Sequence, residues 1–200
     1  MTFAQLRKGI TLVTLAGSLL ILGAWVTQET KVSPASIQPA TPADGHTIHV
    51  TAPHVVDGKV MGPYHHYCKV LSPEPVIECL CYSSSEPGAR LEQVEYIIAK
   101  SITRTGAVSL ADWNKNWHDH KQEIATGRVQ VRDMPPEKAK EVADLVSTTD
   151  GIIFHIWSHD DQVPNGRVVI AQSVGHVNLT QAELKEGAHE PAGAKPSGAR

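Results

Sequence analysis

The stretch YHHYCKVLSPEPVIECLCYS, residues 64–83, decides how we expect the chain to fold. Both halves are rich in β-branched and aromatic residues, which favour strands. The segment SPEP between them cannot continue a strand, because proline has no backbone N–H to give to a sheet. The stretch therefore predicts a β-hairpin with strands over residues 64–71 and 76–83.

The register of this hairpin brings cysteine and histidine together. A two-residue turn places Cys68 opposite Cys79 and His66 opposite Cys81, and all four side chains then lie on one face. Two interpretations are open. In an oxidising compartment Cys68 and Cys79 would form a cross-strand disulfide, whereas a tetrahedral zinc site would use all four side chains. We favour the disulfide, because a flat ladder does not converge well on an ion.

The rest of the chain alternates between strand and helix patterns. A third strand is expected over residues 90–100, and two more over residues 152–158 and 167–174. Residues 109–127 predict one helix, which starts at a capping serine and stops at a glycine, and residues 135–146 predict a second helix. Together these elements predict an α+β fold, a mainly antiparallel sheet of about five strands with two helices packed on it.

Four segments are expected along the 200 residues. An uncharged apolar run at residues 9–26 follows Arg7 and Lys8, which predicts a signal peptide or an N-terminal membrane anchor over residues 1–28. Five prolines in residues 29–63 predict a flexible tether. A folded domain over residues 64–185 and a disordered tail over residues 186–200 follow. The charge order predicts an exported domain on the periplasmic side of the inner membrane, either anchored by residues 9–26 or released by cleavage.

Composition and motifs exclude several function classes. The formal net charge is −3 and the Lys and Arg residues are scattered, so nucleic acid is not an expected partner. The sequence has no glycine-rich phosphate loop, no HExxH and no GxSxG. Catalytic residues and a reaction are therefore not assigned.

Histidine is the unusual component, with eleven copies. Several of them, together with glutamates, fall on faces that the predicted elements turn inward, and a shared polar pocket is a typical place for a divalent metal such as zinc. The candidate ligands are His65, His66, Glu95, His118, His120, Glu123 and His155. On a continuous helix His118 would point about 200° away from His120, so the two could share a site only if the helix ended there.

Several landmarks in fixed order resemble the oil body-associated protein family. They are HHYC at residues 65–68, ARLEQVEYII at 89–98, WHDHKQE at 117–123, and His155 with Trp157. The resemblance covers the expected folded domain and implies a membrane lipid surface as partner, because the plant members are proteins of seed oil bodies. The apolar leader departs from that family.

Two functional hypotheses follow. In the first, the chain is a non-enzymatic, membrane-associated protein of this family whose histidine cluster is structural. In the second, the chain is a metal-binding protein or a metal-dependent enzyme that uses the His and Glu cluster. Convergence of the candidate side chains on one point would favour the second hypothesis.

Overall fold

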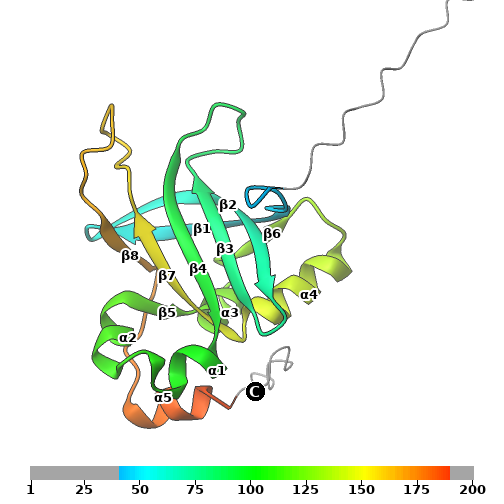
Figure 1. Ribbon diagram of the computed structural model, residues 1–200, viewed down its shortest axis with the longest axis vertical. Helices are drawn as coiled ribbons and strands as arrows, with labels where there is room; N and C mark the ends of the chain where they lie inside the picture. The colour runs from blue at the N-terminus through cyan, green and yellow to red at the C-terminus, as the bar shows by residue number, and fades with distance from the viewer. Residues whose placement is uncertain (1–40, 190–200) are drawn as a thin grey trace, which may run out of the picture. The chain divides into compact units, whose positions relative to one another are not determined.

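The computed structural model describes residues 41–189, which form the fold shown in Figure 1. The apolar segment at residues 9–26, the first part of the expected tether and residues 190–200 lie outside this range. Within residues 41–189 no helix is long and apolar enough to cross a membrane.

Eight strands make up a single antiparallel sheet in the described part of the chain. Their bounds are β1 (Ile48–Val56), β2 (Lys59–Ser72), β3 (Val76–Tyr82), β4 (Leu91–Ala99), β5 (Trp117–Asp119), β6 (Gln130–Arg132), β7 (Thr149–His155) and β8 (Val169–Ser173). The sheet closes on itself, because β1 pairs with β2 on one side and with β8 on the other. Six strands, β1-β2-β3-β4-β7-β8, thus form a closed barrel, while β6 adds to β1 and β5 adds to β7.

The expected fold class is therefore wrong. Residues 41–189 are mostly β and form a closed barrel with few short helices, whereas we expected a sheet of about five strands with two helices packed on it. The discrepancy comes mainly from β1 and the first part of β2, which occupy residues expected to be tether. Without β1 the predicted sheet had no strand to join β8 to β2.

A tight turn builds the missing hairpin. Asp57 and Gly58 connect β1 to β2 with positive φ angles of 48° and 76°, as a two-residue Asp-Gly hairpin turn requires. Pro53 lies where the register of β1 shifts, so the strand accommodates a residue that cannot donate to the ladder. The proline content that indicated a tether is thus compatible with a strand.

The β2–β3 hairpin has the predicted register. Cys68 pairs with Cys79, His66 with Cys81 and His65 with Tyr82. A disulfide joins Cys68 to Cys79, and Cys81 is a buried free thiol. The disulfide uses two of the four side chains of the zinc block considered above.

The helices in the described part of the chain are short. Their bounds are α1 (Lys100–Ile102), η1 (Thr103–Ala107), α2 (Leu110–Asn116), α3 (His120–Ala125), α4 (Pro136–Val146) and α5 (Gln181–Gly187). In Figure 1 α1, α2 and α5 gather at one end of the barrel, and α4 lies beside α3. Helix α4 falls where the second helix was expected.

The single helix expected over residues 109–127 is broken in the middle. Ser109 caps α2 as expected and accepts a hydrogen bond from the Asp112 N–H at 3.1 Å, but the helix ends at Asn116. The next three residues, Trp117–Asp119, form β5 and pair with Asp150–Ile152 of β7. The backbone hydrogen bonds to β7 replace those of the helix, and α3 then starts afresh at His120.

Candidate metal centre

Three buried ligand atoms converge inside the barrel wall. Glu95 on β4 places Oε1 3.2 Å from His118 Nε2 and 3.2 Å from His120 Nε2. The two histidine nitrogens are themselves 3.3 Å apart. All three side chains are at most 3% exposed. We call this group, Glu95 with His118 and His120, the His118–His120 site.

The break between α2 and α3 is what brings both histidines to this site. His118 points inward from β5, Asp119 points the other way, and His120 begins α3. Outside the site, Asp119 Oδ1 lies 2.8 Å from Lys100 Nζ, and Asp119 Oδ2 lies 2.9 Å from Arg104 NH2. These buried ion pairs fix the position of Asp119, which lies between His118 and His120 in the sequence.

A threonine orients His120. Thr149 donates its hydroxyl hydrogen to the carbonyl of Val146 at 2.6 Å, so its oxygen accepts the hydrogen bond from His120 Nδ1 at 3.0 Å. The neutral ring therefore has its hydrogen on Nδ1 and a lone pair on Nε2, facing Glu95. Metal-binding histidines usually have such a partner on the second nitrogen.

Gly151 leaves room for the site. It lies opposite His118 in the β5–β7 pair. A Cβ atom at this position would be 2.5 Å from His118 Nε2 and 2.6 Å from Glu95 Oε1, closer than real contacts allow. The convergence of the three ligand atoms therefore depends on a residue without a side chain.

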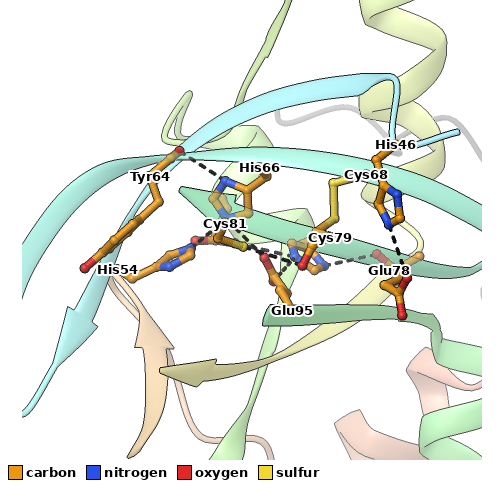
Figure 2. The surroundings of a disulfide bond; sticks show 12 residues. His46, His54, Tyr64, His66, Cys68, Glu78, Cys79, Cys81 and Glu95 are labelled. Carbon is orange, nitrogen blue, oxygen red and sulfur yellow. Dashed lines mark hydrogen bonds and ion pairs between the residues drawn. A yellow bond between two sulfur atoms is a disulfide. The ribbon is translucent and has the colours of Figure 1, made fainter. Parts of the chain in front are cut away.

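A second histidine pair lies on the other oxygen of Glu95. His66 Nε2 is 3.2 Å from Glu95 Oε2 and 3.2 Å from His54 Nε2. Figure 2 shows His54, His66 and Glu95 pointing toward one another beside the Cys68–Cys79 disulfide. We call His54, His66 and Glu95 the His54–His66 site.

Burial and neighbouring charges shift the pKa values of these groups. Burial alone would raise the pKa of Glu95, but its contacts with His118, His120 and His66 outweigh burial and hold the pKa well below its usual value. Burial and the neighbouring His66 lower the pKa of His54 to about 3. For His66 burial opposes protonation, yet Cys81 and Glu95 raise its pKa well above 6.5. The surroundings of His66 thus favour a positive charge.

Glu123 on α3 lies next to the His118–His120 site. Its Oε2 is 3.6 Å from His118 Nε2 and 3.9 Å from His120 Nε2, while its Oε1 is buried without a hydrogen-bond partner. Burial raises the pKa of Glu123 to about 7, although the nearby His118 acts in the opposite direction.

A small cavity of about 30 Å³ adjoins these groups. Its polar lining comes from His66, Glu95, His120 and Glu123, and its remaining lining is mostly apolar, including Val142, Leu145 and Val146 of α4. A cavity of this size holds one or two water molecules. A metal with three protein ligands keeps a coordination position for water, so the arrangement is suited to a metal-bound water with a carboxylate beside it.

The structure brings together five of the seven candidate ligands. His66, Glu95, His118, His120 and Glu123 converge as described above. His65 lies on the other face of β2, where its Nδ1 is 3.0 Å from His49 Nε2. His155 is buried in the barrel but contacts Gln93, at 3.2 Å, and not the cluster.

Sequence reasoning missed three residues of the centre, His54, Thr149 and Gly151. A signal for His54 is present in the sequence, because Val50, Ala52, His54 and Val56 alternate before an Asp-Gly turn. No comparable local signal exists for Thr149 and Gly151. Their role depends on pairing between β7 and β5, which are distant in the sequence from β4.

Comparisons with known proteins found a family model and several relatives that match this chain. Residues 40–196 match the family DUF1264, described as a protein of unknown function. The chain is 32% identical to oil body-associated protein 1B of Arabidopsis thaliana over 97 residues, which is 48% of this chain and 38% of that protein. It is 33% identical over 105 residues to oil body-associated protein 1A of Zea mays, covering 51% of this chain and 42% of the relative.

A longer match is to oil body-associated protein 2A of Zea mays, 28% identical over 155 residues, or 76% of this chain and 57% of that protein. The chain thus spans about half the length of these relatives. No solved structure matches it. The resemblance inferred from HHYC, ARLEQVEYII and WHDHKQE is confirmed: the chain belongs to the DUF1264 family of proteins of unknown function, together with the oil body-associated proteins.

Proposed function

We propose that this chain is a metal-binding protein that holds a divalent metal ion such as zinc between Glu95, His118 and His120. The observation that carries the proposal is the mutual spacing of 3.2, 3.2 and 3.3 Å among the three ligand atoms. Metal–ligand bonds of about 2.1 Å give ligand spacings of about 3.4 Å in a tetrahedron and about 3.0 Å in an octahedron. The observed spacings lie between these two values.

The hydrogen bonds at this site leave lone pairs without a donor, which favours a bound cation over a purely structural histidine cluster. With His120 Nε2 carrying a lone pair, the acceptors Glu95 Oε1 and His120 Nε2 face each other at 3.2 Å. The neutral ring of His118 can donate at most one hydrogen, from Nε2, to these two acceptors. A bound cation would satisfy all three ligand atoms, and lone pairs that converge in a buried place are costly without one.

Metal analysis of the purified full-length chain tests the proposal. After dialysis against metal-free buffer, we expect at least one equivalent of a divalent transition metal per chain, measured by elemental mass spectrometry. The variants His118→Ala and His120→Ala should lose the ion bound at the His118–His120 site. His49→Ala is the matched control, because His49 is also a buried histidine but contacts Asp133 and His65 instead.

Folding has to be checked in the same samples. The variants should retain the far-ultraviolet circular dichroism of the wild type, so that metal loss reports on ligation. A folded wild-type chain that takes up no divalent transition metal, even when the metals are added back, would rule the proposal out. The histidine cluster would then be structural, as in the first hypothesis.

We also propose that the chain works at a membrane lipid surface, on the exported side of a membrane. Three observations support this location. Residues 9–26 are apolar and uncharged, relatives carry the name oil body-associated protein, and the disulfide between Cys68 and Cys79 is of a kind that persists in oxidising compartments.

Membrane fractionation tests this second proposal. We expect the full-length chain to sediment with membranes and to remain there after a carbonate wash. The double variant Leu15→Lys, Leu19→Lys should enter the soluble fraction, because each lysine in the middle of an apolar segment costs about 3 kcal/mol of insertion free energy. The matched control is Leu15→Ile, Leu19→Ile. Recovery of the lysine variant in the washed membranes would contradict the proposed role of residues 9–26.

A further inference from the structure

The two oxygens of the Glu95 carboxylate serve two different histidine pairs. Oε1 contacts His118 and His120, while Oε2 contacts His66, which in turn contacts His54. The ligand atoms of His54, His66 and Glu95 all lie within 4.8 Å of one another, and all three side chains are buried. Each side of the carboxylate therefore offers two imidazole nitrogens and one oxygen.

The hydrogen positions at the second pair follow from its fixed partners. His66 Nδ1 lies 3.1 Å from the backbone carbonyl of Tyr64, which can only accept. His66 must therefore have a hydrogen on Nδ1, and its neutral ring carries a lone pair on Nε2.

Gln93 fixes the hydrogen position on His54 in the same way. The Gln93 amide nitrogen donates to His155 Nδ1 at 3.2 Å, so its carbonyl oxygen accepts from His54 Nδ1 at 2.6 Å. The neutral ring of His54 then has its lone pair on Nε2. When both rings are neutral, the three acceptors His54 Nε2, His66 Nε2 and Glu95 Oε2 thus meet in a buried place with no hydrogen among them.

We infer that the barrel holds a second divalent metal ion at the His54–His66 site, with the Glu95 carboxylate bridging the two ions. The inference rests on the proposed function to the extent that both sites share Glu95. Imidazole nitrogens with their second nitrogen fixed by a hydrogen bond, together with a carboxylate oxygen, are a donor set suited to zinc, iron and other divalent transition metals. The strand pairing supports this site, because β1, β2 and β4 each supply one of its ligands.

A lone proton is the competing occupant. If His66 is protonated, its Nε2–H can donate to Glu95 or to His54, and no second ion is required. The two cases differ in the number of metal ions that one chain takes up, and that number can be counted.

The experiment is a titration of the chelator-stripped, full-length chain with Zn²⁺, followed by mass spectrometry of the elements after removal of free metal. We expect two equivalents in the wild type. His54→Ala should retain one, because it leaves the His118–His120 site complete, and His118→Ala should also retain one. His49→Ala, a buried histidine outside both sites, should retain two.

The outcomes distinguish failure of the second site, His54–His66, from failure of the proposed His118–His120 site. A single equivalent in the wild type that persists in His54→Ala and is lost in His118→Ala would overturn the second site and leave the proposed function in place. No uptake in the wild type would remove both. Two equivalents that His54→Ala does not reduce would also overturn the inference. A wild-type count below two overturns the second site even where a variant fails to fold.

Discussion

At position 151 a Cβ atom would lie 2.5 Å from His118 Nε2 and 2.6 Å from Glu95 Oε1. We therefore expect Gly151→Ala to separate the ligand atoms of the His118–His120 site and to abolish measurable Zn²⁺ binding there. The variant should still fold, because alanine is otherwise tolerated in a strand. Competition titration with a coloured chelator measures the loss. Gly88→Ala is the control, since a Cβ there meets no atom within 4 Å, and unchanged binding in Gly151→Ala would contradict the proposed position of the ion.

Thr149 allows a test of the same site without touching a ligand. Thr149→Val removes the hydroxyl that accepts from His120 Nδ1 at 3.0 Å, and loss of such a partner typically weakens metal binding about 10- to 100-fold. Thr149→Ser keeps the hydroxyl and should restore most of the affinity. The ratio of the two dissociation constants for Zn²⁺ is the measurement. Equal affinity in the valine and serine variants would show that the hydroxyl has no role in ligation.

At the scale of single residues, much of the buried His and Glu cluster could be predicted from the sequence. His66, Glu95, His120 and Glu123 could be selected because their spacing on predicted strands and helices turned them inward. His118 could be placed only by knowing that the helix ends before it. Gly151 could not be identified at all, because its importance lies in the side chain it lacks and in a strand pairing between distant segments.

Among the elements, β5 and β7 are held by a buried ion network. Arg104 donates to Asp150 through Nε at 2.9 Å and through NH2 at 2.5 Å, and Asp150 is fully buried. Arg104→Met should lower the unfolding free energy by about 3–5 kcal/mol, because it leaves a buried carboxylate without its counter-ion. Urea unfolding measures this change.

An exposed ion pair provides the comparison. Lys138 and Glu141 on α4 are 2.8 Å apart at the surface, so Lys138→Met should cost less than about 1 kcal/mol. If both methionine variants had similar unfolding free energies, the network around Asp150 would not be a main support of β5 and β7.

The β2–β3 hairpin gives a prediction about cysteine chemistry. Because Cys68 and Cys79 are bridged and Cys81 is free, thiol counting under denaturing conditions should find one free thiol per chain before reduction and three after it. The bridge closes a loop of 11 residues, and its loss in Cys68→Ala, Cys79→Ala should cost roughly 2–3 kcal/mol of stability. Three free thiols in protein recovered from the exported compartment would contradict the bridge.

Elements with local signals were predicted well. The β2–β3 register followed from one turn, and α4 followed from its apolar spacing. The helix over residues 109–127 was predicted wrongly, because pairing of Trp117–Asp119 with β7 overrides the local helical period. The β1–β2 hairpin was missed because its prolines outweighed the Asp-Gly turn in our interpretation.

For the molecule as a whole, closure of the barrel could not be predicted from the sequence. Closure requires β8 to pair with β1, a contact between segments more than a hundred residues apart, and no local pattern encodes it. With β1 counted as tether, the sequence indicated an open sheet. The barrel matters for the proposed function because it brings candidate ligands from β1, β2, β4, β5 and α3 together in one place.

Metal binding should stabilise the whole barrel, because ligands from distant strands and α3 must come together to hold the ion. A ligand at 100 times its dissociation constant adds about 2.7 kcal/mol to the unfolding free energy, which corresponds to a Tm increase of roughly 5–11 °C for a chain of this size. Thermal unfolding with and without Zn²⁺ measures the increase. Glu95→Gln should lose most of it, and an equal increase in Glu95→Gln would mean that Zn²⁺ binds elsewhere.

The most direct test of the metal centre is an anomalous difference map, recorded at the zinc absorption edge from crystals of the zinc-loaded chain. We predict a peak at about 2.0–2.2 Å from Glu95 Oε1, His118 Nε2 and His120 Nε2. Zinc bound only at surface histidines, with no anomalous peak between these three atoms, would contradict it.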